Sequence, residues 1–260
     1  KSKGNIIDPI DIIDGIELEE LIKKRTFGLM NPNQKEKIIA NTKKEFPNGI
    51  NSFGTDAMRF TFCSLASGSR DINFDLKRLE GYRNFCNKLW NAANFIKIQC
   101  KGYDNKKVLS KNLEDFWIYD EFNKTAENFS KHIDSYRFDL ATQVTYDFFW
   151  EKFCDWYIEF CKIKLNDPKV TQPEKNKIKA SLIDLMHKSL ILFHPILPFI
   201  TEEIWQEFKP FHKSKLLSIS QEKFPEVKKI SRDFSKIEAL KESISGIRNI
   251  RSEMLISHKI

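Results

Sequence analysis

The chain has 260 residues, of which 41% are hydrophobic and 30% are charged, and its formal net charge is +7. This length allows one or two domains, and the composition is that of a globular rather than a disordered chain. Glycine and proline number only nine each, which disfavours turn-rich all-β folds, and no stretch approaches the ~18 uninterrupted apolar residues that a membrane span needs.

The five cysteines contain no Cys-x-x-Cys pair, so neither a zinc ribbon nor a thioredoxin-like motif is available. We expect buried, reduced thiols in a cytoplasmic protein. The sequence also lacks a glycine-rich phosphate loop, a His-Glu-x-x-His motif and a nucleophile elbow. We therefore expect no metal site and no self-contained active site, and we expect His194, which precedes a proline at a helix end, to be structural.

The hydrophobic pattern divides the chain near residue 55. Residues 1–54 read as irregular, with short extended pieces and turns over 6–16 and short helices over 17–25 and 34–45. From Thr55 onward the period is helical. It predicts helices over 55–67, 75–100, 112–136, 138–165, 173–193, 201–208 and 233–254. The pattern therefore favours a mainly α fold, a helical bundle with the nearly all-apolar helix 138–165 at its centre.

The predicted helix over 75–100 carries an unusual row of side chains. On a helical wheel a broad apolar face is formed by Leu79, Tyr82, Cys86, Leu89, Trp90, Ala93 and Ile96. Opposite this face we expect one narrow stripe, called here the polar row, which consists of Lys77, Gly81, Asn84, Lys88, Asn91 and Phe95. Residues 75–107 hold eight lysines or arginines and three acids, so much of the excess positive charge lies on this segment.

Each residue type in the polar row suits single-stranded RNA. Lysine neutralises phosphate, asparagine offers a donor and an acceptor to a base edge, and an exposed phenylalanine carries a stacked base, worth ~1–3 kcal/mol. Two other readings remain open at this point. The row is also compatible with a solvated helix face whose single phenylalanine packs on a neighbouring helix, and with the interface of a helical protein–protein docking module.

Several strings resemble the valyl-tRNA synthetases, a family of class I aminoacyl-tRNA synthetases, and they occur in family order over essentially the whole chain. The opening Lys-Ser-Lys-Gly-Asn is similar to the tail of the KMSKS signature. The string over 81–92 (GYRNFCNKLWNA) is the most specific for valine. The others lie at 54–60 (GTDAMRF), 70–75 (RDINFD), 153–157 (FCDWY) and 194–199 (HPILPF).

The resemblance implies a domain order. Residues 1–70 would hold the tail of the KMSKS loop and a small mixed stem-contact region. Residues 71–225 would form the helical anticodon-binding bundle of the class I synthetases. Residues 226–260 would be a final helix that leads toward a C-terminal arm. Catalytic and editing domains of the same chain would precede residue 1, so the resemblance implies a fragment that ends before the C-terminal coiled coil.

The resemblance also implies a function. The whole enzyme would be a valine–tRNA ligase that uses ATP and Mg²⁺ to attach valine to tRNA(Val). This piece would bind the anticodon stem-loop, hold no cofactor and be inactive alone. A fragment of an isoleucine- or leucine-specific synthetase is the alternative within the same class.

Residue roles follow by motif alignment. Lys1 would be the second lysine of KMSKS, a catalytic and ATP-binding residue, with Ser2 beside it. Lys77, Lys88, Asn91 and Phe95 would contact the anticodon loop, and Asn84 joins them through the wheel. Position 77 is arginine in some relatives, and lysine lacks the planar fork needed for a bidentate base contact. Arg59 and Arg70 would touch the tRNA backbone or form salt bridges with neighbouring acids.

Overall fold

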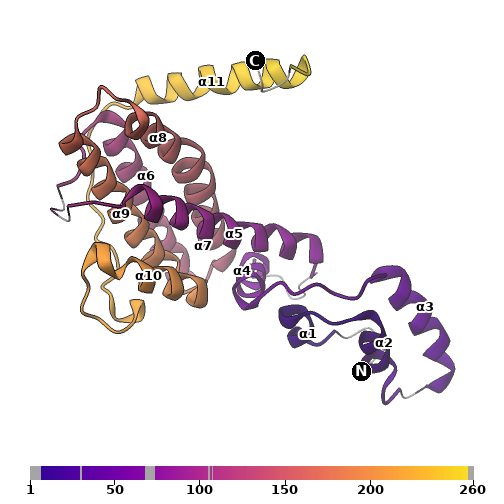
Figure 1. Cartoon of the computed structure of the whole chain (residues 1–260). Helices are drawn as coiled ribbons and strands as arrows, with labels where there is room; N and C mark the ends of the chain where they lie inside the picture. Colours follow the sequence, from indigo (N-terminus) through magenta and orange to yellow (C-terminus); the bar gives the residue numbers. More distant parts are fainter. Residues whose placement is uncertain (1–6, 30, 68–73, 105, 107, 257–260) are drawn as a thin grey trace.

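The structure is a computed structural model that describes residues 7–29, 31–67, 74–104, 106 and 108–256. Its described residues are mainly helical, as predicted. Figure 1 shows most helices gathered in a bundle, with a smaller N-terminal unit set apart at one end and a long C-terminal helix along one side. None of the described helices is both long and apolar enough to cross a membrane.

The N-terminal unit is more helical than the sequence indicated. It contains α1 (Pro9–Asp14), α2 (Leu18–Thr26), a short 3₁₀ turn η1 (Pro32–Gln34) and α3 (Lys35–Glu45). The extended pieces expected over 6–16 are instead α1. Asp8 caps this helix by accepting a hydrogen bond from the Ile10 amide at 2.9 Å, and Pro9 follows at the first helical position. Both features favour a helix start.

The expectation of a mixed region over residues 1–70 is therefore wrong for its described part. Its extended backbone is limited to isolated bridges, and the longer-range one pairs Ile16 with Ile50 through two 2.8 Å hydrogen bonds. Gly49 precedes the second partner with φ +75°, and a Cβ there would lie 2.2 Å from the Ile16 carbonyl oxygen. Only glycine fits this close approach.

Helix α4 (Thr55–Leu65) joins the N-terminal unit to the bundle. Its Ala57 and Met58 pack with Ile12 and Leu79 in a small cluster, whereas its Phe60 belongs to the main core. Helix α4 therefore contributes side chains to two hydrophobic cores, the small N-terminal cluster and the main core of the bundle. The division into residues 1–70, 71–225 and 226–260 stays a prediction.

The bundle consists of helices that match the predicted ones closely. They are α5 (Leu76–Gln99), α6 (Leu113–Asp134), α7 (Phe138–Tyr146), the π-helical segment η2 (Asp147–Tyr157), α8 (Ile158–Asn166), α9 (Gln172–Phe193) and α10 (Pro198–His212). Capping boxes begin α6 at Asn112 and α9 at Thr171. Helix α10 begins earlier than predicted because Pro198 provides a favourable first residue, and it also ends later, at His212.

The central helix is one continuous rod made of α7, η2 and α8. Phe148, Phe149, Phe153 and Tyr157 are fully buried, which agrees with the predicted central position. A π-helical turn holds an extra residue, and here two consecutive phenylalanines, 148 and 149, both point into the core. Trp150 and Trp156 are only half-buried, so the rod keeps one partly open side.

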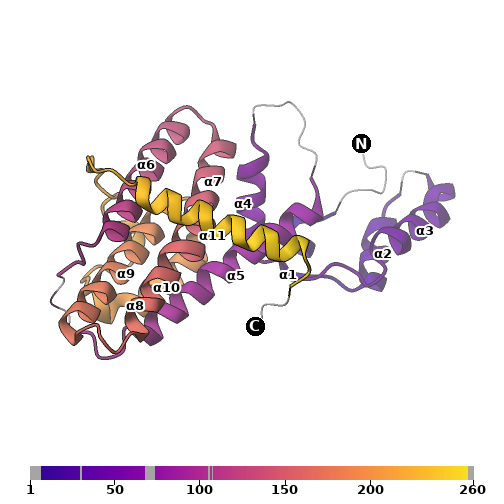
Figure 2. The ribbon, with the colours of Figure 1, turned by 90° about the horizontal axis from the view of Figure 1, so that it is seen from above.

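Helix α11 (Ser235–Glu253) closes the described chain. It is anchored near its start, where Ile237 is buried and the Trp117 indole donates a 2.9 Å hydrogen bond to Glu238. Figure 1 shows it along one side of the bundle, and Figure 2 shows it crossing in front of the bundle helices. Near its C-terminal end, the Arg248 guanidinium lies 5.2 Å from the centre of the Trp156 ring. A 3₁₀ turn, η3 (Ile219–Gln221), lies in the segment that precedes it.

Candidate nucleic-acid interface

Helix α5 positions the polar row. Asp75 caps its N-terminus by accepting a hydrogen bond from the Lys77 amide at 2.9 Å. Phe85 and Ala92, which the helical wheel left out of the apolar face, are buried. These two residues lie between that face and the polar row. The polar row therefore flanks the bundle core instead of lying opposite to it, and two of its members reach neighbouring helices.

The outer members of the row face solvent. Lys77, Gly81, Asn84 and Asn91 are exposed, and a Cβ added at Gly81 would meet no atom within 4 Å. They offer one cation, two amides and an unobstructed stretch of backbone along one side of α5. This combination can contact phosphates and base edges without a conformational change.

Lys88 lies against the central rod. Its ammonium is 2.8 Å from a carboxylate oxygen of Asp155 and 4.7 Å from the centre of the Trp150 ring. The two charged side chains keep 31% and 41% of their surface exposed. The ion pair is therefore accessible to solvent, and a phosphate could compete with the carboxylate for the lysine.

Phe95 is half-buried and packs against the main core. The ammonium of Lys162, from α8, lies 4.9 Å from the centre of its ring and also pairs with Glu159 at 2.6 Å. Phe95 therefore packs partly on neighbouring side chains, as the solvated-face interpretation expected, and the rest of its ring stays exposed. The ring and Lys162 still form a combined aromatic and cationic patch at the end of the polar row.

The other predicted site residues are placed differently. Arg59 donates hydrogen bonds to the carbonyl oxygens of Ile196 at 3.1 Å and Pro195 at 3.0 Å, which ties α4 to the connection between α9 and α10. Its predicted contact with the tRNA backbone stays a prediction. Arg70 and the two N-terminal residues, Lys1 and Ser2, lie outside the described residues.

Sequence reasoning missed the residues that the central rod contributes. Asp155 lies inside one of the family-like strings, and Lys162 follows it by seven residues, or about two helical turns, so both fall on one side of the rod. That spacing was a usable signal. Their contacts with the polar row depend on how the rod crosses α5, which spacing alone does not indicate.

One group of side chains has the composition of a metal site. His187, His212 and Glu222 place their ligand atoms within 4.8 Å of one another. The two imidazole rings are stacked, with centroids 4.5 Å apart and planes inclined by 19°. Ring-nitrogen lone pairs lie in the ring plane, so stacked rings do not direct them at one point. Trp205 completes this network by donating a hydrogen bond to His187 at 3.2 Å, and we assign it a packing role.

The cysteines are all free thiols. Burial raises the pKa of Cys86, Cys100 and Cys154 to about 12. These thiols are therefore protonated at neutral pH, and none of the three is suited to act as a nucleophile.

A comparison with protein-family profiles shows which family the chain belongs to. A sequence profile described as "Anticodon-binding domain of tRNA ligase" matches residues 115–260, more than half of the chain. The chain belongs to this family. The polar row precedes the matched residues, so its assignment rests on the longer alignments described next.

Those alignments are with valine–tRNA ligases. The chain is 47% identical over 260 residues to the protein from Acinetobacter baylyi, 45% over 273 residues to that from Psychrobacter arcticus and 47% over 262 residues to that from Coxiella burnetii. The alignments cover 98%, 100% and 99% of this anticodon-binding chain. The chain spans only 27–28% of the length of these relatives.

Proposed function

We propose that the chain is the anticodon-binding portion of a valine–tRNA ligase and that its polar row binds the anticodon loop of tRNA(Val). One observation supports this most strongly. The polar row and the patch of Phe95 and Lys162 form one line along α5 that combines cations, amides and an aromatic ring. Unpaired nucleotides need this combination, because phosphates bind cations while bases stack and hydrogen-bond.

The whole protein would attach valine to tRNA(Val) with ATP and Mg²⁺. In it, Lys1 and Ser2 would serve the ATP site as the end of the KMSKS signature, and this site would be completed by catalytic and editing domains of the same chain. Arg59 and Arg70 would follow the tRNA backbone. We propose a cytoplasmic location, which fits the free thiols. This portion alone would bind RNA without catalysis.

The test is binding of a tRNA(Val) anticodon stem-loop to the 260-residue chain. Phe95→Ala is expected to weaken binding by about 5- to 150-fold, which corresponds to ~1–3 kcal/mol for one stacked base. Phe199→Ala removes an exposed phenylalanine from α10 and serves as the matched control. If Phe95→Ala folds normally and leaves the dissociation constant unchanged, the assignment of this ring is wrong.

Two further measurements separate the alternatives. Stem-loops with isoleucine and leucine anticodons are expected to bind more weakly than the valine one, and equal or reversed binding would favour a different amino-acid specificity. A protein partner that survives nuclease treatment, together with no measurable RNA binding, would favour a docking module instead.

A further inference from the structure

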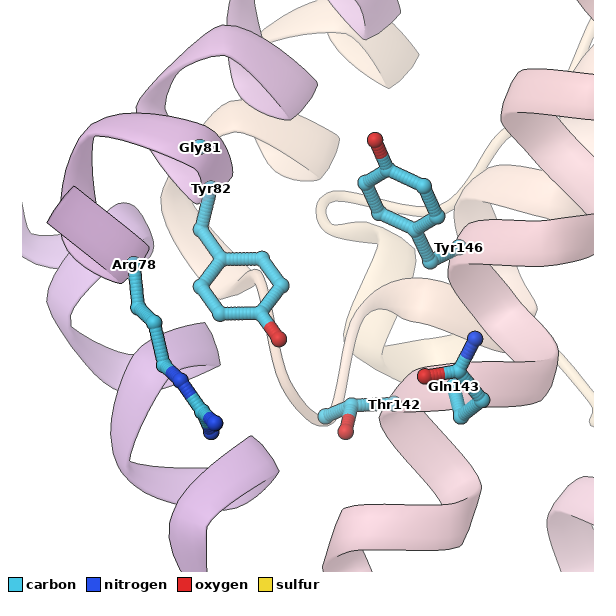
Figure 3. Close-up of a pocket in the computed structure, with 6 residues that line it drawn as sticks. All are labelled: Arg78, Gly81, Tyr82, Thr142, Gln143 and Tyr146. Atoms are coloured by element: carbon cyan, nitrogen blue, oxygen red, sulfur yellow. The ribbon is translucent and has the colours of Figure 1, made fainter.

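A cavity separate from the polar row lies between α6, α9 and the chain that connects α10 to α11. Its volume is about 860 Å³, which is within the range of ~300–1,000 Å³ for small-molecule sites. None of the residues that line it comes from α5 or the central rod. A smaller pocket of about 280 Å³ at Gly81, between α5 and α7 (Figure 3), borders the polar row and belongs to the candidate interface. The larger one, called here the α6–α9 cavity, has no part in that interface.

The floor of the α6–α9 cavity is made by one face of each helix. Phe116, Tyr119 and Asn123 line it from α6, and His187 and Ile191 line it from α9. Residues three and four positions apart lie on the same side of a helix, so each set forms a stripe that faces the same space. The lining is mainly apolar. Because the packing of the bundle forms this floor in advance, an apolar ligand can leave water without reordering the helices.

The buried polar groups at the floor already have partners. The Tyr119 hydroxyl donates a 2.7 Å hydrogen bond to Asp184, and the Lys188 ammonium donates another to the same oxygen at 2.6 Å. Asp115, which is almost fully buried, accepts a 2.8 Å hydrogen bond from the Tyr157 hydroxyl. An apolar ligand can therefore cover these groups without leaving a polar atom unpaired.

The chain between α10 and α11, residues 213–234, forms the roof of the cavity. Figure 1 shows it running along the bundle from the end of α10 to the start of α11. It is tied at Ser218, whose hydroxyl donates a 2.7 Å hydrogen bond to Glu202, and at Lys228, whose carbonyl oxygen accepts a 2.6 Å hydrogen bond from the Asn123 amide. The roof is therefore fixed at two points, and the cavity is bounded by two helices and by this segment.

Lysines gather around the cavity. One of them, Lys188, pairs with Asp184. The other three, Lys111, Lys223 and Lys228, are exposed, and among the residues that the structure describes no carboxylate lies within 4.0 Å of their ammonium groups. These three lysines therefore have no ion pair to give up when they meet an anion.

The acids of the lining compensate only part of this charge. Asp115 is buried and hydrogen-bonded, and Glu222 lies 3.2 Å from the Nε2 atom of His187. Glu226, in the roof, is exposed. A ligand at the open side of the cavity therefore meets three lysines and one exposed acid, and this excess of positive charge favours an anionic group over a cationic one.

We propose that the α6–α9 cavity binds a small amphipathic carboxylic acid. Its apolar body lies between α6 and α9 beneath the roof, and its carboxylate meets the ammonium groups of Lys111, Lys223 and Lys228. The apolar floor selects the body of the ligand, the lysines select its charge, and the volume limits its size. The site uses no residue of the polar row, so this inference goes beyond the proposed function and does not depend on it.

Straight-chain carboxylates are suitable probes, because their length and their head group can be changed separately. Hexanoate, octanoate and decanoate are titrated into the 260-residue chain by isothermal calorimetry. Each added pair of methylenes is expected to lower the dissociation constant by about 10-fold, since the pair moves from water into the cavity. 1-Decanol, which has the same chain and no charge, is expected to bind about 5-fold more weakly than decanoate, and decyltrimethylammonium more weakly still.

Two kinds of variant locate the site. Lys111→Gln and Lys223→Gln keep most of the side chain, and each should weaken decanoate by about 1.5- to 5-fold while 1-decanol is unchanged. Lys236→Gln on α11, outside the lining, should change neither. Leu216→Trp places a large side chain in the lining and should weaken both probes by about 10-fold or more. Leu217→Trp is its matched control, because this neighbour is 80% exposed and is not part of the lining.

The outcomes decide the proposal. Circular dichroism first shows that each variant is folded, and if Leu216→Trp is not, the lysine variants carry the test. No binding of decanoate, or equal affinities for decanoate and 1-decanol, would show the proposal to be wrong. Lysine variants that bind decanoate like the Lys236 variant, or a folded Leu216→Trp that binds it like Leu217→Trp, would place the binding elsewhere and overturn it too. RNA binding is measured separately, so either proposal can fail while the other stands.

Discussion

Lys88 and Asp155 form an ion pair between α5 and η2, with 2.8 Å between the ammonium and the carboxylate oxygen. The pair joins two residues 67 positions apart in the chain, and it places a negative charge beside the predicted RNA-binding lysine. In the free protein, Asp155 therefore pairs with the same ammonium group that a phosphate would bind. Partly exposed pairs of this kind contribute only ~0.2–1 kcal/mol, so exchanging the carboxylate for a phosphate costs little.

Replacing Asp155 is expected to strengthen RNA binding. Asp155→Asn removes the competing charge while it keeps the side-chain volume, and the dissociation constant of the anticodon stem-loop is expected to fall about 1.5- to 5-fold. Titration by fluorescence anisotropy measures this change. Asp184→Asn, which removes the partner of Lys188 on α9, should have no effect. Weaker binding by the Asp155 variant would mean that Asp155 itself contacts the RNA.

RNA binding is expected to weaken with salt, because lysines that neutralise phosphates release counterions. On unpaired RNA the log–log slope is ~−0.7 for each neutralised phosphate. Lys77→Ala and Lys88→Ala should each reduce the magnitude of the slope by about 0.7. Lys236→Ala on α11 is the control. A salt-independent dissociation constant would rule out the phosphate contacts assigned to the polar row.

Acidic pH is expected to destabilise the connection between α9 and α10. Burial lowers the pKa of His194 below its ordinary value of 6.5, although Glu202 and Asp56 act in the opposite direction. As the pH falls below 6.5, the unfolded chain takes up the proton before the folded chain does. The stability that neutral His194 contributes is therefore present above that pH and is lost as the pH falls through the folded-state pKa.

His194→Gln should remove the pH-dependent part of the stability that neutral His194 contributes. Urea unfolding at about pH 7.5 and about pH 5 measures it: the difference in unfolding free energy between the two pH values should be smaller in the variant. Parallel pH profiles for the His194 variant and the unmodified chain would contradict the argument.

Asp56 is expected to be important for stability at the junction between α4 and α10. Its carboxylate accepts hydrogen bonds from the Ile200 amide at 2.6 Å and the Phe199 amide at 3.4 Å, at the N-terminus of α10. Asp56→Ala should lower the unfolding free energy by about 1–3 kcal/mol, because the two partly buried amides lose a charged partner. Asp233→Ala, which removes an exposed contact to the Ser235 amide at the start of α11, should cost less. Equal losses of unfolding free energy in the two variants would contradict this expectation for Asp56.

Local patterns predicted most of the helices, because a helix is specified by neighbours three and four residues away and by its caps. They failed at α1, where extended pieces were expected over 6–16 but the cap at Asp8 and the proline at the first helical position begin a helix. They also failed at Phe85. A wheel centred on the most apolar positions did not show how far the core extends around α5.

The sequence by itself determined the mainly helical fold, the polar row as a set of residues on one side of α5, and the family resemblance that the comparisons support. Only the tertiary structure decided which of those residues face solvent. The crossing of the central rod over α5 brings Asp155 to Lys88 and Lys162 to Phe95, and the packing of α7 beside α5 forms the pocket at Gly81. Helical periodicity describes one helix at a time. These contacts join residues far apart in the chain, and they are set by the way large buried side chains such as Phe149 and Phe153 fill the space between helices.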